Sequence, residues 1–109
     1  MSAEPIQSGA ARERMADIAR VANRAGYIWL SRRWPNDDAA LDSIIALGIM
    51  ARPPRGRVTL TDGERLDRAR ASAVRAVARL RALATCPAMD QGQREEVATI
   101  ADALAASIR

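Results

Sequence analysis

Apolar residues return every three or four positions along most of this chain, which is the period of a helix with one buried face. In the first third of the chain the steps alternate between four and three, at Ala11, Met15, Ile18, Ala22, Ala25 and Trp29. This spacing predicts a helix from about residue 9. Gly26 leaves open whether residues 27–34 continue that helix or form a short one of their own. Pro35 ends it, because the residue before a proline is pushed out of the helical region.

Three more helices are expected downstream. The second follows Asn36 or Asp37 as its cap and ends at Gly48, with an expected buried face of Leu41, Ile44, Ile45 and Gly48. The third covers about 62–84, with a heptad of Leu66, Ala69, Ala73, Ala76, Leu80 and Leu83. The fourth is capped by Asp90 and has its stripe at Val97, Ile100, Ala101, Leu104 and Ile108. A short loop joins the last two helices, so they should form an antiparallel pair.

The helical pattern breaks between residues 49 and 60. Residues 49–52 and 57–60 are each of strand length, and the Pro-Pro-Arg-Gly sequence between them favours a turn. This predicts a small β-hairpin over about 49–60. Thr61 and Glu64 then match a capping box, in which the Thr hydroxyl accepts from the Glu64 N–H and the Glu side chain accepts from the Thr61 N–H. Leu60 is placed to pack onto the helix that follows.

The length of 109 residues allows one domain. Residues 1–8 are expected to be a flexible lead, and residues 9–109 a single domain made of a core (9–61) and the C-terminal helical pair (62–109). The apolar fraction of 49% is normal for a globular protein, but there is no Phe and much of that fraction is Ala. The core should therefore be shallow, and a partner subunit could complete it, which favours an oligomer.

Positive charge gathers in one segment. All 17 basic residues are Arg, and the formal net charge is +4. Residues 52–81 carry nine Arg and three acids, whereas residues 1–51 are neutral and residues 82–109 have a net charge of −2. Such a segment suits a polyanion or an acidic protein. A GC-rich genome, whose codons favour Arg, would produce the same residues without a binding role.

Missing residue types exclude several function classes. With no His and only Cys86, the chain offers no internal disulfide, zinc site or imidazole catalysis. It has no Gly-rich phosphate loop, nucleophile elbow or metal-ligand spacing, so neither an enzyme nor a cofactor, metal or small-molecule substrate is expected. No apolar run is long enough to span a membrane and the N-terminus lacks the shape of a signal peptide, which favours a cytoplasmic location.

One segment carries a family resemblance. Its residues are Leu41, Ile44, Leu47, Gly48 and Ile49, the run Gly56-Arg57-Val58-Thr59-Leu60-Thr61, and then Gly63 and Leu66. In this order they resemble the winged-helix family, in particular MarR- and PadR-type regulators, which close their wing with a similar run before a dimerisation helix. Gly63 lies one residue nearer to Thr61 than is usual there. The resemblance implies a mainly α, winged-helix-like core with the hairpin as its wing, and it would send the helix at 37–48 into the major groove of DNA.

The first functional hypothesis is a small winged helix-turn-helix regulator of transcription that contacts DNA phosphates or the minor groove through its Arg-rich wing. The candidate DNA-binding residues are Arg52, Arg55, Arg57, Arg65, Arg68, Arg32 and Arg33. The last two lie between Trp29 and Trp34, which either stack on single-stranded nucleic acid or complete the core. The helix at 37–48 offers no Arg and would bring carboxylates towards the phosphates, which argues against ordinary major-groove readout.

Those carboxylates support a second hypothesis. A phage- or plasmid-type inhibitor or anti-activator could use the same fold to dock on a protein partner, either through Asp37, Asp38 and Asp42 or through the basic wing. A structural helical subunit of a larger assembly is a third. A homodimer is expected through the heptad Leu66, Ala69, Ala73, Ala76, Leu80 and Leu83, although the same heptad could instead be an internal seam against the last helix.

Overall fold

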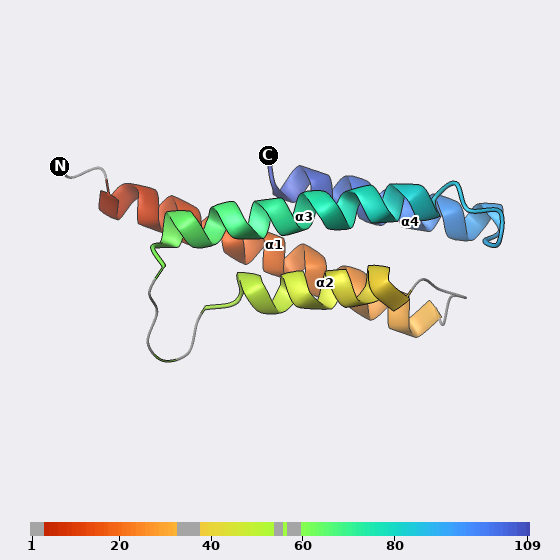
Figure 1. The fold of residues 1–109 in the computed structure, drawn as a ribbon, viewed down its shortest axis with the longest axis horizontal. Helices are drawn as coiled ribbons and strands as arrows, with labels where there is room; N and C mark the ends of the chain where they lie inside the picture. The colour runs from red at the N-terminus through yellow and green to blue at the C-terminus, as the bar shows by residue number, and fades with distance from the viewer. Residues whose placement is uncertain (1–3, 33–37, 54–55, 57–59) are drawn as a thin grey trace.

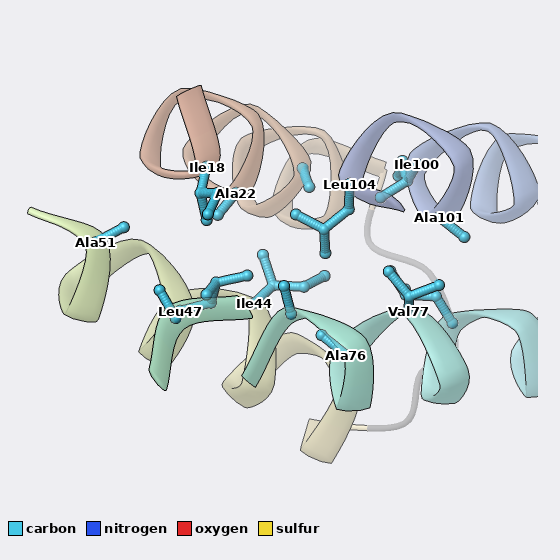
Figure 2. Packing of buried hydrophobic residues seen from close by; sticks show 14 of the residues in the cluster. Ile18, Ala22, Ile44, Leu47, Ala51, Ala76, Val77, Ile100, Ala101 and Leu104 are labelled. Carbon is cyan, nitrogen blue, oxygen red and sulfur yellow. The ribbon is translucent and has the colours of Figure 1, made fainter. Parts of the chain in front are cut away.

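Four helices, each antiparallel to the one before it, make up the protein in a computed structural model that describes residues 4–32, 38–53, 56 and 60–109 (Figure 1). They are α1 (Glu4–Arg32), α2 (Asp38–Ala51), α3 (Asp62–Leu83) and α4 (Gln91–Ser107). Side chains of α1 and α4 face those of α2 and α3 across a shared core (Figure 2). The expectation of a mainly α protein is confirmed.

The expected β-hairpin and winged-helix-like core are wrong. The described residues contain no strand: α2 continues through residues 49–51, Arg52 and Leu60 lie in bends, and Thr61 already caps α3. Ala51 explains the longer helix, because it is 3% exposed and extends the buried line Ala40, Ile44, Leu47 and Ala51 at helical spacing. The rest of the supposed wing, at residues 54–55 and 57–59, lies outside the described part of the chain.

Two glycines that looked like helix breaks lie inside helices, and one of them, Gly48, leaves room for a side chain of α1. Gly26 is buried within α1, where an added Cβ would lie 3.8 Å from Cγ2 of Ile44. Gly48 is buried within α2, where an added Cβ would lie 2.7 Å from Oδ1 of Asn23. Helix α1 is therefore continuous to Arg32. It also begins earlier than expected, at Glu4, within the predicted flexible lead.

The buried faces of α1, α3 and α4 are largely those that the spacing predicted. All six expected positions of α1 are buried, as are the first five of the α3 heptad and the first four of the α4 stripe. Leu83 and Ile108, at the ends of the two stripes, are partly buried. On α2 the prediction is wrong for Ile45, which is 43% exposed, and Leu47 is buried instead. Trp29 is the largest fully buried side chain, which supports its role in a core without Phe.

Local side-chain hydrogen bonds begin the last two helices. At α4 the capping box is complete: Oδ1 of Asp90 accepts from the Gln93 N–H at 2.8 Å, and Oε1 of Gln93 accepts from the Asp90 N–H at 3.0 Å. At α3, Oγ1 of Thr61 accepts from the Glu64 N–H at 3.1 Å, as predicted. The Glu64 carboxylate, however, accepts from the Thr61 hydroxyl at 3.2 Å. The expected antiparallel pairing of α3 with α4 is confirmed (Figure 1).

Candidate nucleic-acid interface

Those arginines predicted to bind DNA that lie among the described residues do not form one surface. Arg65 is turned inwards: its side chain is 12% exposed, with Nη1 3.2 Å from Oδ1 of Asp62 and Nη2 donating to the carbonyl oxygen of Arg52 at 2.9 Å. Arg52 is exposed just beyond α2, and Arg68 is exposed on α3. Arg55 and Arg57 lie outside the described residues.

Arg32 lies far from this group. Its Nε donates to Oε2 of Glu96 on α4 at 3.1 Å. Arg12, which pairs with Asp62 near Arg65, lies 20 residues earlier on the same helix, a separation of about 30 Å at 1.5 Å per residue. Arg33 falls outside the described residues, as does Trp34. Trp29 is only 1% exposed and belongs to the core, so of the two alternatives for this residue the structure supports the core role and not stacking on a base.

Asp62 is the centre of an ionic cluster at the start of α3. Besides its contact with Arg65, its Oδ2 accepts from Nε of Arg12 at 2.8 Å. The cluster ties α3 to α1 and, through Arg65 and the Arg52 carbonyl, to the end of α2. An open cleft of about 530 Å³ lies beside the cluster; Arg12, Asp62 and Arg65 line it together with apolar residues such as Met15 and Leu60. The charges of Arg65 and Asp62 are therefore already paired within the protein, which makes these two residues less suited to binding a ligand.

A different row of arginines follows the outer face of α3. Arg68, Arg75 and Arg79 are exposed and occupy positions i, i+7 and i+11, which form one line along a helix. The line is about 16 Å long at 1.5 Å per residue. Exposed Ala71, Ala78 and Ala82 lie on the same side of the helix. We call Arg68, Arg75 and Arg79 the α3 arginine row.

The surroundings of the row are basic and open. Residues 68–89 contain five Arg and no Asp or Glu. Within the described chain, Arg68 and Arg75 have no ion-pair partner. Arg75 and Arg79 also line an open groove with Ser43 of α2 and Cys86 after α3. Of the other two arginines of the segment, Arg81 lies on the α4 side of α3, where its Nη2 is 3.6 Å from Oδ1 of Asp102, and Arg70 is half-buried.

Sequence reasoning named Arg68 but missed Arg75 and Arg79. The signal was present in the spacing of the three residues and in the long segment without acids. The hairpin prediction instead placed the binding residues at Arg52, Arg55 and Arg57. The row could be assigned to the outside of α3 only once its opposite face was known to be buried.

The residues expected at a dimer interface lie inside the single chain. Leu66, Ala69, Ala73, Ala76 and Leu80 are buried in the shared core, and Leu83 packs against it. The α3 heptad is thus used by the other helices of the same chain. Of the acidic residues considered for partner binding, Asp42 is exposed on α2, Asp38 begins that helix, and Asp37 lies outside the described residues.

The described residues were also compared with the requirements of a metal site and of a membrane span. It contains no cluster of three or more Cys, Asp or Glu residues that could hold a metal ion. No helix there is both long and apolar enough to cross a membrane. No protein-family model matches the chain, and no curated protein or solved structure is significantly similar to it.

Proposed function

We propose that this protein binds the phosphate backbone of nucleic acid through the α3 arginine row, without reading base sequence. The observation that carries the proposal is the alignment of Arg68, Arg75 and Arg79 on one exposed line of a rigid helix. This proposal replaces the wing as the contact element and does not involve a winged-helix fold.

The chemistry of the row suits phosphate. Each guanidinium is charged at any physiological pH and donates paired hydrogen bonds to phosphate oxygens. The alanines beside the row are small, so a phosphate backbone can approach the helix closely. Binding releases counterions from the nucleic acid, which supplies free energy independent of sequence.

The acidic residues around the α3 arginine row limit which part of the surface can contact phosphate. Glu64 and Asp67 lie at the start of α3 and limit the row on that side. Asp42 is exposed on α2 and would repel phosphates there. The contact we propose is therefore made by the later part of α3 and not by α2.

The salt dependence of binding tests this proposal. Affinity for random duplex DNA and for single-stranded RNA is measured by fluorescence anisotropy from about 20 to about 300 mM salt. Three phosphate contacts predict a slope of log K against log salt of about −3, since each contributes roughly −0.9 on duplex DNA. In Arg75→Ala/Arg79→Ala the slope should fall to about −1, with weaker binding at every salt concentration.

A matched control removes the same charge elsewhere. Arg14→Ala/Arg24→Ala deletes two exposed α1 arginines that have no ion-pair partner among the described residues. This variant should keep the slope of the unmodified protein. If both double variants lower the slope equally, general charge and not the row is responsible. If neither nucleic acid binds at the lowest salt concentration, the proposal fails.

A further inference from the structure

Helix α2 is apolar on both its buried and its exposed sides. Its only polar residues are Asp38, Asp42 and Ser43. On the outer side Ile45 is 43% exposed and Ile49 is 63% exposed. A surface helix of a monomer normally places polar residues there, and a helix that is apolar all round is normally covered.

Helix α1 widens this apolar face. The Asn23 side chain lies against Gly48, so the α1 residues on that side run beside α2. Tyr27 and Leu30 follow Asn23 at i+4 and i+7 and are 75% and 61% exposed. With Ile45 and Ile49 they expose on the order of 400 Å² of side-chain surface, the size at which an apolar patch usually marks a contact site.

Charges of opposite sign lie at the two ends of the exposed α2 line. Asp42, Ile45, Ile49 and Arg52 are separated by three, four and three residues, the spacing of one helical seam. Arg52 continues the last turn, because its N–H donates to the carbonyl oxygen of Ile49 at 3.2 Å. Both Asp42 and Arg52 are exposed, and neither has an ion-pair partner in the described part of the chain. We call these four residues the α2 seam.

We propose that the α2 seam binds a second copy of the same chain, with the two α2 helices antiparallel about a two-fold axis level with Leu47. Asp42 lies three residues before Ile45, and Arg52 lies three residues after Ile49. A two-fold axis that places Ile45 opposite Ile49 of the other copy therefore also places Asp42 opposite Arg52 of the other copy. The antiparallel arrangement brings each helix N-terminus near the C-terminus of the other, which is favourable for the helix dipoles.

This self-complementarity is why a second copy fits better than a foreign protein. A two-fold interface uses the same patch on both subunits, so each charge needs its opposite at the symmetry-related position of that patch. The α2 seam meets this condition, and the two ion pairs form together. The apolar surface supplies roughly half of the ~800 Å² per partner in a standard interface, so a dissociation constant in the micromolar range is expected.

Sedimentation equilibrium of the full chain and of three charge variants tests the dimer. The unmodified protein should associate to a dimer as its concentration rises through the micromolar range. Asp42→Arg sets Arg against Arg52 of the other copy, and Arg52→Asp sets Asp against Asp42, each twice in the dimer. Each variant alone should bind itself at least about tenfold more weakly, because like charges replace opposite charges. The double variant Asp42→Arg/Arg52→Asp should regain the original affinity.

Mixing the two single variants is the sharpest measurement. One copy then carries Arg at both ends of the seam and the other carries Asp at both ends, so the mixture should form a heterodimer although neither variant dimerises well. Asp67→Arg, an exposed charge reversal on α3, is the control and should leave association unchanged. Circular dichroism verifies that every variant is folded. A monomer at all concentrations, a dimer insensitive to these changes, or a mixture that does not associate would overturn the proposal and leave the face to a different protein.

Discussion

Replacing Asp62 by Asn should destabilise the protein far more than an ordinary surface substitution, because this carboxylate pairs with the largely buried Arg65 and also with Arg12 of α1. The change keeps the size of the side chain and removes its charge. The amide that replaces the carboxylate would retain only one acceptor oxygen, whereas Oδ1 of Asp62 now accepts from Arg65 at 3.2 Å and Oδ2 accepts from Arg12 at 2.8 Å.

The magnitude follows from the exposure of each partner. The Arg65 side chain is only 12% exposed, so leaving it without a carboxylate should cost about 2 kcal/mol, less than the 3–5 kcal/mol of a fully buried pair. The Arg12 side chain is 74% exposed, and its contact contributes a few tenths of a kcal/mol after solvent screening. The loss of a negative charge in the first turn of α3 adds roughly 0.5 kcal/mol. A total decrease of about 2–3 kcal/mol in unfolding free energy is expected.

Urea unfolding followed by far-UV circular dichroism measures this difference. Arg12→Ala should lower the unfolding free energy by less than about 0.5 kcal/mol, because it removes only the exposed contact. Asp67→Asn is the matched control, since Asp67 is exposed on the same helix and has no partner within the described residues. Equal stability of Asp62→Asn and Asp67→Asn would refute the claim that the largely buried Arg65 needs the Asp62 carboxylate.

Three further substitutions test the helix packing and the caps. Ala favours a helix over Gly by about 1 kcal/mol, but Gly48→Ala should be neutral or destabilising, because its Cβ would lie 2.7 Å from Oδ1 of Asn23. In an Asn23→Ala background, where that contact is absent, the same change should raise the unfolding free energy measured in urea by about 1 kcal/mol. An equal effect in both backgrounds would show that the contact is unimportant. Asp90→Ala should cost about 1–2 kcal/mol in thermal unfolding, because it removes the acceptor that serves the Gln93 N–H. Thr61→Ala should cost a similar amount, about 1 kcal/mol, because it removes both the acceptor of the Glu64 N–H and the hydroxyl that donates to the Glu64 carboxylate; no loss of stability would contradict this hydrogen-bonding pattern.

The parts of the fold that depend on local spacing could be predicted from the sequence. The buried line of α1, the α3 heptad and the Asp90 cap involve residues within a few turns of one another. Gly48 shows where such reasoning fails. A glycine after an apolar run is typical of a helix end, but here it makes room for Asn23 of another helix, which only the packing reveals. Because the helix was predicted to end at Gly48, residues 49–52 were predicted to form a strand.

The candidate site was harder to predict because an arginine's role depends on its partners. Arg65 is internal on account of Asp62 three residues away, and Arg32 is engaged by Glu96, 64 residues away. No pattern around Arg32 indicates that distant contact. Arg75 and Arg79 could have been found from their spacing, but choosing them over Arg32 required knowing which side of each helix is covered.

The order of the contacts between helices also bears on how the chain folds during synthesis. Helix α2 packs against α1, α3 packs against both, and α4 packs against α3 and α1. From α2 onwards, each helix that leaves the ribosome therefore has an earlier helix to pack against. Since contacts between neighbouring elements close short loops, this order favours rapid folding and brief exposure of the apolar faces. The order of contacts therefore allows an alanine-rich core, with little area per residue to bury, to be built one helix at a time during synthesis.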